Sequence, residues 1–470
     1  MVETREKAVA AAAVDDFRST LRGELIRPVD AGYEEARKVH NAMIDRRPRF
    51  IVRCADPADV ISSVNFAREN NILLSVRGGG HGVPGFAVND GGLVIDLSRL
   101  KGIRVDPARR TVRAQGGCTW GDVNHATEPF GLHTPGGVVS TTGVGGLSLG
   151  GGIGHLTRPF GLVSDNIISA DVVTADGRFL VASEKENADL YWALRGGGGN
   201  FGVVTSFELQ LHELRAVFAG PIVWPLDKAA DVLRFYAEFI NNAPEELNAI
   251  FAFLMVPPGD PFPEHLHNKN MCAAVVCYAG PLEKAGEATR PLREFGPPAF
   301  HHLGPMPFPV LQTIFDPIAP PGMFNYWKAD FVSDLTAPII EGHAKFGAKT
   351  PNIFSGVHIF STSGAAQRVA KDATAWTYRD ARFVHVIHAE YTDPAETEQH
   401  RAWVREYWEA LHPHSAGGAY VNFLMDEGED RVAASYGDNY QRLVDVKKKY
   451  DPTNLFRMNQ NISPNGARAG

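Results

Sequence analysis

The stretches that decide the fold are RGGGHG at residues 77–82 and GVGGLSLGGGIGHLTR at residues 143–158. Because glycine has no Cβ atom, such runs let backbone N–H groups approach a large ligand closely and form concavities that bind phosphate. Two runs of this kind predict a site for a large phosphate-bearing cofactor. The first run also holds a histidine, His81, shortly after the apolar, strand-like residues 72–76. That position suits a reactive group held on a rigid edge.

Length and composition fit a globular protein with more than one domain. The chain has 470 residues, enough for two sizeable cores. Hydrophobic residues make up 44% and charged residues 21%, and the formal net charge of -8 is spread without long blocks of one sign. Nothing in this pattern indicates a nucleic-acid partner. The 47 glycines cluster, which favours cofactor-binding loops over low-complexity sequence.

The cysteines and the apolar runs predict the cellular setting. Cys54, Cys118, Cys272 and Cys277 have neither the spacing of a metal or redox site nor the density of a disulfide scaffold, which favours a reduced, intracellular chain. No run approaches the roughly 18 apolar residues that span a bilayer, and the N-terminus lacks the apolar core of a secretory signal. We therefore expect a cytoplasmic protein with no membrane partner. No histidine group has the carboxylate or cysteine neighbours of a metal site, so no metal is expected.

Residues 80–85 formally match the G-x-G-x-x-G pattern of dinucleotide-binding loops. A Rossmann unit requires a helix to open at these glycines. Here the sequence continues with a turn at 88–92 and a further strand-like run at 93–97. The pattern therefore disfavours a Rossmann domain.

The organisation of the chain changes near residue 213. Before it, two strand-like runs at 170–174 and 179–182 flank an Asp-Gly turn and predict a hairpin. After it, the glycine density falls and longer elements appear. Helices are expected near 226–242, 333–345 and 396–411, and strands near 249–255, 271–278, 354–361 and 381–390. Strands grouped with helices, without regular βαβ alternation, favour an α+β substrate domain.

Four motifs in order carry a family resemblance. They are RGGGH at 77–81, GVGGLSLGGGIG at 143–154, GNFGVVT at 199–205 and YDPTNLF at 450–456. Together they resemble the berberine bridge enzyme-like flavoproteins, within the vanillyl-alcohol oxidase and p-cresol methylhydroxylase group. The resemblance covers nearly the whole chain and is weakest over residues 213–350.

The resemblance implies a fold and a domain division. The fold class it implies is α+β, with a two-lobed FAD-binding domain of the vanillyl-alcohol oxidase type and an antiparallel-sheet substrate domain covered by helices. We expect the FAD-binding domain at 1–212, the substrate domain at 213–415, and at 416–470 a C-terminal segment that returns to the FAD-binding domain.

The resemblance also implies the cofactor. FAD would be joined covalently to the protein through His81 and the flavin 8α-methyl group. A neutral imidazole can add to that electrophilic position when a loop holds it there; the alternative is a histidine that only caps a glycine turn. The residues expected to bind the cofactor are Arg77, Gly78, Gly79, Gly80, His81, Gly82, Thr141, Thr142, Gly143, Gly145, Gly146, Gly152, Gly154, Gly202, Val204, Asn422 and Asn459.

The chain departs from the family pattern at two positions. Many relatives carry a second covalent link from a cysteine, and Val139 occupies that position here, so a single link is expected. Relatives often end a Tyr-x-Asn-Tyr motif with a catalytic tyrosine, but this chain ends it with Phe423, which cannot take a proton. Asn422 can still hydrogen-bond the flavin edge, as the resemblance implies. The general base must then come from elsewhere, unless the substrate needs none.

Oxidation of an alcohol or amine by a flavin passes a hydride to flavin N5 while a side chain removes the accompanying proton. We expect His385 to be that base. Alternation along the strand FVHVIH at 383–388 puts His385 and His388 on opposite faces, and the resemblance aligns His385 with an acidic, substrate-facing position in some relatives. Tyr378 and Tyr420 are the reserve candidates. For all three, a packed or surface residue is the competing interpretation.

The predicted activity is that of an FAD-dependent oxidoreductase. We expect hydride transfer from a small alcohol-type substrate, namely a sugar, a phenolic alcohol or a secondary-metabolite intermediate. Thr142 resembles the small residue that admits oxygen beside the flavin in this family, which favours an oxidase using O2. The alternatives are a flavin dehydrogenase with another acceptor, an NADPH-dependent flavin reductase whose FAD is not covalent, and a flavoprotein that has lost catalysis and acts as a binding module. A monomer or a homodimer is expected.

Overall fold

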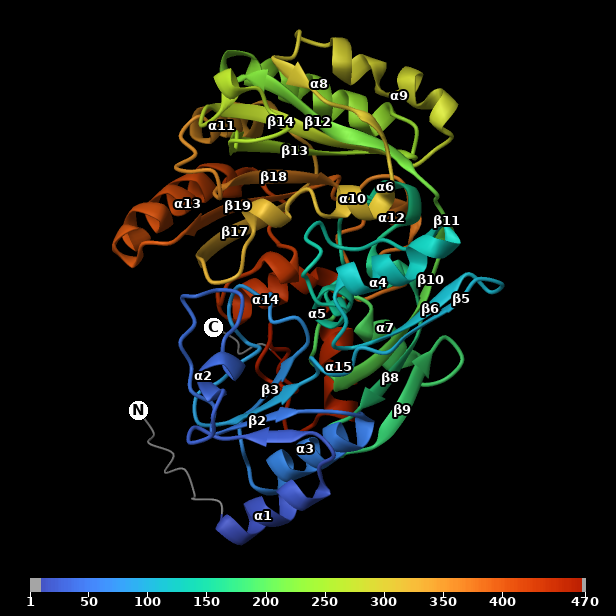
Figure 1. Cartoon of the computed structure of the whole chain (residues 1–470), viewed down its shortest axis with the longest axis vertical. Coiled ribbons are helices and arrows are strands. Elements are labelled where there is room, and N and C mark those ends of the chain that lie inside the picture. The colour runs from blue at the N-terminus through green and yellow to red at the C-terminus, as the bar shows by residue number, and fades with distance from the viewer. Residues whose placement is uncertain (1–9, 467–470) are drawn as a thin grey trace.

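The computed structural model describes residues 10–466. Figure 1 shows two halves, with one large sheet and its covering helices above and the N-terminal sheets below. The red C-terminal helices lie in the lower half, beside segments from the first half of the sequence. Among the described residues, no helix has both the length and the hydropathy needed to cross a bilayer.

The first sheet of the lower half has four strands in the order β1-β2-β4-β3. Its strands are β1 (Glu24–Ile26), β2 (Phe50–Arg53), β3 (Leu74–Arg77) and β4 (Leu93–Asp96). Both β2 and β3 run parallel to β4, whereas β1 is antiparallel to β2. After β3 the chain passes through its glycine loop to β4 without forming a helix, which agrees with the disfavoured Rossmann interpretation.

Helix α3 (Pro57–Glu69) connects β2 to β3, and the residues at its N-terminus explain where it begins. The side chain of Asp56 accepts hydrogen bonds from the N–H groups of Ala58 and Asp59, and Pro57 occupies the first turn. These are the start signals that the sequence contains. With apolar residues at 60, 61, 64 and 67, they predict a helix over residues 56–68, and the structure confirms it.

The second sheet of the lower half has five strands in the order β5-β6-β10-β8-β9, and every pair in it is antiparallel. Its strands are β5 (Ile103–Asp106), β6 (Thr111–Gln115), β8 (Ile167–Val173), β9 (Phe179–Ser183) and β10 (Val203–Gln210). Strands β8 and β9 form the predicted hairpin. Its turn residue Gly177 has a φ of 80°, a backbone conformation that favours glycine. A small separate pair joins β7 (Leu132–His133) and β11 (His212–Glu213).

The upper half is built on an eight-stranded antiparallel sheet in the order β15-β12-β14-β13-β18-β19-β17, with β16 also paired to β12. Its strands are β12 (Val217–Pro225), β13 (Leu247–Met255), β14 (Asn270–Tyr278), β15 (Phe300–His301), β16 (Gly304–Met306), β17 (Phe324–Val332), β18 (Gly356–Ser361) and β19 (Phe383–Tyr391). The helices over one face are α8 (Ala229–Asn242), α9 (Leu282–Glu294), α11 (Ala337–Gly347) and α13 (Thr397–Leu411). The opposite face is turned toward the lower half (Figure 1). The α+β class with a helix-covered antiparallel sheet is confirmed.

The C-terminal part returns to the lower half through α14 (Glu429–Tyr436) and α15 (Tyr440–Tyr450), and α15 packs beside α7 (Ala188–Leu194) (Figure 1). A buried lysine, Lys447, fixes this return. Its Nζ donates to the carbonyl oxygens of Asn200 and Phe456 and lies 2.8 Å from a carboxylate oxygen of Asp451. The tail is thereby tied to a further run of glycines at 196–199, which ends just before Asn200. The domain boundaries after residues 212 and 415 remain predictions from the sequence.

The helical spacing of Phe17, Leu21 and Leu25 predicts a helical lead-in over residues 1–45, and this prediction is only partly correct. Helix α1 covers Ala11–Thr20, but Leu25 lies in strand β1. A Cβ atom at Gly23 would lie 2.1 Å from the carbonyl oxygen of Arg53, so close backbone contact with β2 determines the conformation there. Residues 1–9 of the predicted lead-in lie outside the described part of the chain. The remaining helices are α2 (Tyr33–Ala36), α4 (Trp120–Thr127), α5 (Val144–Leu149), α6 (Thr157–Phe160), α10 (Phe308–Gln312) and α12 (Ala365–Arg368).

Candidate active site

A pocket of about 350 Å³ is lined by the glycine loops of the lower half and by the inner face of the eight-stranded sheet. Pockets that hold small molecules and cofactors have volumes of roughly 300–1,000 Å³. On the sheet side the lining residues come from three adjacent strands: Trp327 on β17, His358 and Phe360 on β18, and His388 and Glu390 on β19. The pocket is thus built from segments that are far apart in the sequence.

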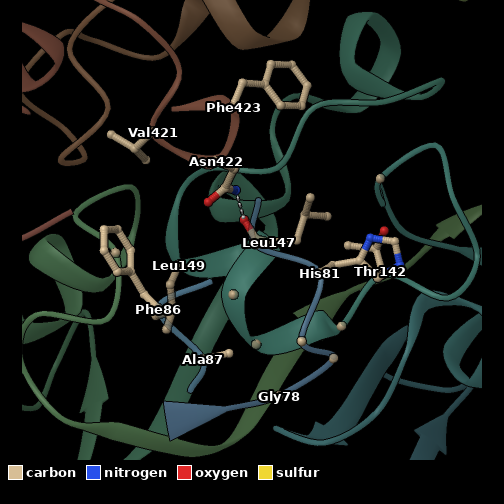
Figure 2. A pocket seen from close by; sticks show the side chains of 18 of the residues that line it. Gly78, His81, Phe86, Ala87, Thr142, Leu147, Leu149, Val421, Asn422 and Phe423 are labelled. Atoms are coloured by element: carbon tan, nitrogen blue, oxygen red, sulfur yellow. Dashed lines mark hydrogen bonds between the residues drawn. The ribbon is translucent and has the colours of Figure 1, made fainter. Parts of the chain in front are cut away.

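Most of the predicted cofactor residues line this pocket. They are Gly78, Gly79, Gly80, His81, Gly82, Thr142, Gly143, Gly145, Gly146, Gly202, Val204, Asn422 and Asn459, and Val139 lines it as well. Figure 2 shows His81 close to Thr142 on one side of the pocket. The structure therefore brings the four motifs of the sequence together around one space.

The other four predicted cofactor residues lie outside the lining and support it. Arg77 is buried and pairs with Asp96 on the neighbouring strand at 2.6 Å. Thr141 hydrogen-bonds the ring of His81. Gly152 and Gly154 lie in the second glycine region and make close contacts there. The N–H of Gly152 donates a hydrogen bond to the hydroxyl of Tyr420. A Cβ atom at Gly154 would lie 2.2 Å from the carbonyl oxygen of Gly136.

Three pocket glycines indicate that the space is kept for a ligand. Gly82, Gly146 and Gly199 all line the pocket, and a Cβ atom added to any of them would meet nothing within 4 Å. None of the three has a positive φ in the range that favours glycine. Neither packing nor backbone strain therefore explains their lack of a side chain. A large ligand that lies against this backbone does explain it.

His81 sits in a defined setting at this pocket. Its Nε2 lies 2.8 Å from Oγ1 of Thr141, a hydrogen bond whose direction depends on the tautomer. Its ring stacks on that of His40 with a centroid separation of 3.9 Å. Burial, together with the adjacent His40, lowers the pKa of His81 to about 3. The imidazole is therefore neutral near pH 7, the form that can act as a nucleophile.

The C-terminal segment closes the pocket from the other side. The amide of Asn422 donates to the carbonyl oxygen of Leu147 over 3.1 Å, as the dashed line in Figure 2 shows. The hydroxyl of the buried Tyr420 accepts hydrogen bonds from Gly152 N–H and from the Asn422 amide. Burial raises the pKa of Tyr420 well above its usual value. Tyr420 therefore braces the glycine loop and is poorly suited to the role of base that the sequence suggested.

The structure does not place His385, the expected base, in the pocket lining. Its side chain is fully buried on the face of β19 that the helices cover, where its ring lies 5.3 Å from that of His343 on α11. Its Nε2 lies 3.6 Å from a carboxylate oxygen of Asp330. Tyr378 is also absent from the pocket lining; its ring stacks on Phe331 and its hydroxyl donates to the carbonyl oxygen of Ala434.

The pocket face of β19 carries His388 and Glu390 instead, and Nε2 of His388 lies 3.1 Å from Nδ1 of His358 on β18. Burial lowers the pKa of His388 to about 4 and raises that of Glu390 to about 8. Strand alternation puts His388 on the opposite face from His385, but it does not show which of the two faces the pocket. No local signal identifies His358 or His40.

No group of three or more histidine, cysteine, aspartate or glutamate side chains in residues 10–466 is arranged to hold a metal ion. The four cysteines are all buried and unbridged. The polar side chains that line the pocket are imidazoles, one carboxyl group, amides, the hydroxyls of Thr142, Tyr420 and Tyr436, and the indole of Trp327.

Comparison with known proteins identifies the family. Residues 48–183 match the family described as FAD binding domain, and residues 419–463 match the family described as berberine and berberine like. An FAD-linked oxidoreductase of Dictyostelium discoideum is 30% identical, over 98% of this chain and 99% of its own length. This chain belongs to the berberine bridge enzyme-like FAD-linked oxidases. As a member of this family it is an FAD-dependent oxidoreductase with the vanillyl-alcohol oxidase fold.

Other known proteins are similar to this chain along nearly their whole length. (R)-6-hydroxynicotine oxidase of Paenarthrobacter nicotinovorans is 31% identical, over 95% of this chain and 98% of its own. The crystal structure of 6-hydroxy-D-nicotine oxidase from Arthrobacter nicotinovorans superimposes with a TM-score of 0.84 at 31% identity, covering 94% of this chain and 98% of that one. Chitooligosaccharide oxidase has the same fold, with a TM-score of 0.84 at 22% identity over 96% of this chain and 99% of its own.

Proposed function

We propose that this berberine bridge enzyme-like protein is an oxidase that transfers a hydride from an alcohol-type small molecule to FAD and uses O2 as the final acceptor. One observation carries the proposal. A pocket with an open glycine wall and a neutral His81 on one side faces aromatic rings, imidazoles and a carboxyl group on the other. When bound, FAD supplies a two-electron acceptor for the substrate hydride. The glycine backbone would hold it, and the sheet side would hold the substrate.

The attachment of FAD through His81 alone is part of the proposal. The neutral imidazole lies in the pocket with Thr141 fixing its ring. Val139 also lines the pocket, but its side chain has no nucleophile for a second link. The set of cofactor-binding residues expected from the sequence is proposed with it, supported by the fact that most of them line one pocket.

The sheet side of the pocket favours an aromatic alcohol, such as a phenolic alcohol, over a sugar. Trp327 and Phe360 come from the sheet, Phe315 and Phe423 extend their ring surface from neighbouring segments, and the imidazole of His358 lies among them. Successive rings meet edge-on or tilted: Trp327 and Phe423 have centroids 5.7 Å apart, as do Phe360 and Phe423. Such a wall offers dispersion and π contacts to a planar substrate. It offers few groups to hydrogen-bond the many hydroxyls of a sugar.

Oxygen as the acceptor is supported by the small Thr142 side chain in the pocket lining. A dehydrogenase that uses another acceptor is the alternative, and hydrogen peroxide formation separates the two. The cytoplasmic location and the monomeric or homodimeric state are kept as predictions of the sequence.

The test uses the purified holoprotein. It is mixed anaerobically with panels of aromatic alcohols and sugars while the flavin absorption is followed, and air is then admitted and hydrogen peroxide measured. We expect bleaching by aromatic alcohols and peroxide on reoxidation. Failure of every compound to bleach the flavin contradicts catalysis, and bleaching by sugars alone contradicts the substrate class.

The covalent link is tested separately by acid precipitation and peptide mass. The wild-type pellet should be yellow, and the tryptic peptide that contains residue 81 should carry the mass of the flavin. The His81→Ala protein should give a colourless pellet, whereas His125→Ala, which changes an exposed histidine, should not. A colourless wild-type pellet would contradict the link and leave a non-covalent flavoprotein.

A further inference from the structure

Three titratable side chains form a chain across the pocket face of the substrate sheet. Glu390 and His388 lie two residues apart on β19, and His358 lies on the adjacent strand β18. Nδ1 of His388 is 3.6 Å from Oε1 of Glu390, and Nε2 of His388 is 3.1 Å from Nδ1 of His358. All three line the pocket. We call them the pocket triad.

All three members of the pocket triad have unused bonding capacity. Among the described residues, Nε2 of His358, Nδ1 of His388 and Oε2 of Glu390 have no hydrogen-bond partner, although all three atoms are buried. Buried polar atoms are usually satisfied, so each such atom calls for an explanation. Catalytic hydrogen bonds are often long before a substrate binds, and the 3.6 Å separation fits that pattern.

The surroundings place the pocket triad beside the reacting region. At one end, Glu390 lies near enough to His40 for His40 to influence its pKa, and His40 stacks on His81. Beside the middle member of the triad, Trp327 contacts both His388 and Phe423, with centroid separations of 5.9 and 5.7 Å. The triad therefore spans the pocket from the His81 side to Phe423, the position that lacks the family's tyrosine.

We propose that the pocket triad is the proton acceptor of the reaction, with His358 as the catalytic base and His388 and Glu390 as the relay behind it. The inference rests on the proposed function. As the substrate carbon loses its hydride to the cofactor, the hydroxyl proton passes to Nε2 of His358. The proton on Nδ1 of His358 passes to Nε2 of His388, and the proton on Nδ1 of His388 passes to Oε1 of Glu390. A C=O bond forms, and the proton ends on a carboxylate.

This order of proton transfers requires the imidazoles of His358 and His388 to be neutral and protonated on Nδ1 at the start. Burial lowers the pKa of both, which keeps them neutral. It also requires Glu390 to be ionised. Because burial raises the pKa of Glu390 to about 8, the carboxylate predominates only above that pH. The rate of hydride transfer should therefore rise as the pH increases through about 8.

The groups that face Glu390 are few. His388 lies on its own strand, His358 follows on β18, and His40 comes from the N-terminal segment. On β17 the residue paired with Glu390 is Asn325, which carries no charge. His40 is itself kept neutral, because burial lowers its pKa. Glu390 is therefore the group that should set the rise near pH 8.

The experiment measures anaerobic flavin reduction by an aromatic alcohol at a series of pH values, using holoproteins with matched flavin content. His358→Gln should lower the limiting reduction rate by about 10²-fold or more, in the range for loss of a general base. His388→Gln should lower it less. Glu390→Gln should remove the rise near pH 8. His385→Gln is the matched control, since it changes a histidine of the same strand on the opposite face and should leave rate and pH profile unchanged.

A second readout is independent of turnover. In protein with ¹⁵N-labelled histidine, the hydrogen bond between the two imidazoles should give a low-field N–H proton resonance. This signal should be absent in both His358→Gln and His388→Gln and present in His385→Gln. If His358→Gln loses its flavin, the His388→Gln rate and the Glu390→Gln pH profile carry the test.

The outcomes separate this inference from the proposed function. Suppose that substrate reduces the wild-type flavin and that the flavins of His358→Gln and His388→Gln are reduced at the wild-type rate, or that Glu390→Gln keeps the rise near pH 8. Either result contradicts the role of the pocket triad as proton acceptor and leaves the proposed oxidase function intact. A wild-type flavin that no substrate reduces overturns the proposed function, and the base with it.

Discussion

Gly79 and Gly143 lie in direct backbone contact. A Cβ atom on Gly79 would be 2.4 Å from the amide nitrogen of Gly143, and a Cβ atom on Gly143 would be 2.3 Å from the amide nitrogen of Gly79. Neither glycine has a positive φ, so close approach rather than backbone conformation requires them. This contact joins the loop that carries His81 to the second glycine region.

Alanine at position 79 should destabilise the protein, because its Cβ atom would clash with backbone atoms of Gly143, which cannot shift without distorting the second glycine region. We expect a cost of about 3 kcal/mol or more, seen as a lower unfolding midpoint in denaturant and a lower flavin content. The matched control is Gly286→Ala in the interior of α9, where nothing lies within 4 Å of the added atom. That change should stabilise the protein by roughly 0.5–1 kcal/mol.

Alanine at position 146 should have the opposite pattern of effects. Gly146 lies in helix α5 and lines the pocket, and its Cβ atom would enter open space. The stability of the apoprotein should therefore stay the same or rise slightly, because alanine has a higher helix propensity than glycine. FAD binding should weaken, since the new methyl group occupies part of the pocket. Unchanged flavin affinity in a titration of apoprotein would show that the cofactor does not lie against this residue.

Acid should destabilise the protein through its buried histidines. The side chain of His155 is almost fully buried without hydrogen-bond partners among residues 10–466, and burial lowers its pKa to about 3. An unfolded histidine titrates near 6.5, so between pH 6.5 and 3 the unfolded chain binds the extra proton and stability falls with falling pH.

This group contributes at most about 1.4 kcal/mol per pH unit across that window. His155→Leu should therefore flatten the acid limb of a plot of unfolding free energy against pH. His301→Gln, at an exposed position, should leave the limb unchanged. An equally steep limb in both variants would show that His155 does not contribute.

The loop that carries Val139 and Thr142 is held from the upper half. The N–H of Ser140 donates to Oδ1 of Asp316 over 2.8 Å, and the hydroxyl of Ser140 contacts the other carboxylate oxygen. Asp316→Ala should cost about 1–3 kcal/mol, because hydrogen bonds to a charged acceptor are lost. We expect faster proteolysis of this loop and easier loss of non-covalent FAD in a His81→Ala background. Protection equal to that of the parent protein would contradict this role.

The parts that sequence could predict are those fixed by local chemistry. The start of α3 follows from Asp56 and Pro57, and the β8–β9 hairpin follows from its Asp-Gly turn. The cofactor loops follow from runs of glycine. The face of β19 could not be predicted in this way, because the strand is buried along its entire length. Alternation separated His385 from His388 without showing which one faces the pocket.

Tertiary assembly decided the remainder. His358 reaches His388 only because β18 pairs with β19, and His40 reaches His81 only because the segment before β2 folds over the glycine loop. Leu25 was expected in a helix and lies in a strand, because β1 pairs with β2. These contacts join segments whose own sequences contain no sign of the partner.

The C-terminal segment that returns to the lower half also determines when the cofactor pocket can form. Asn459 and Gln460 line the pocket together with His40, and Lys447 anchors the segment that carries them. The ribosome therefore has to release nearly the entire polypeptide before the site exists. We therefore expect a chain that stops short of Lys447 to bind no flavin.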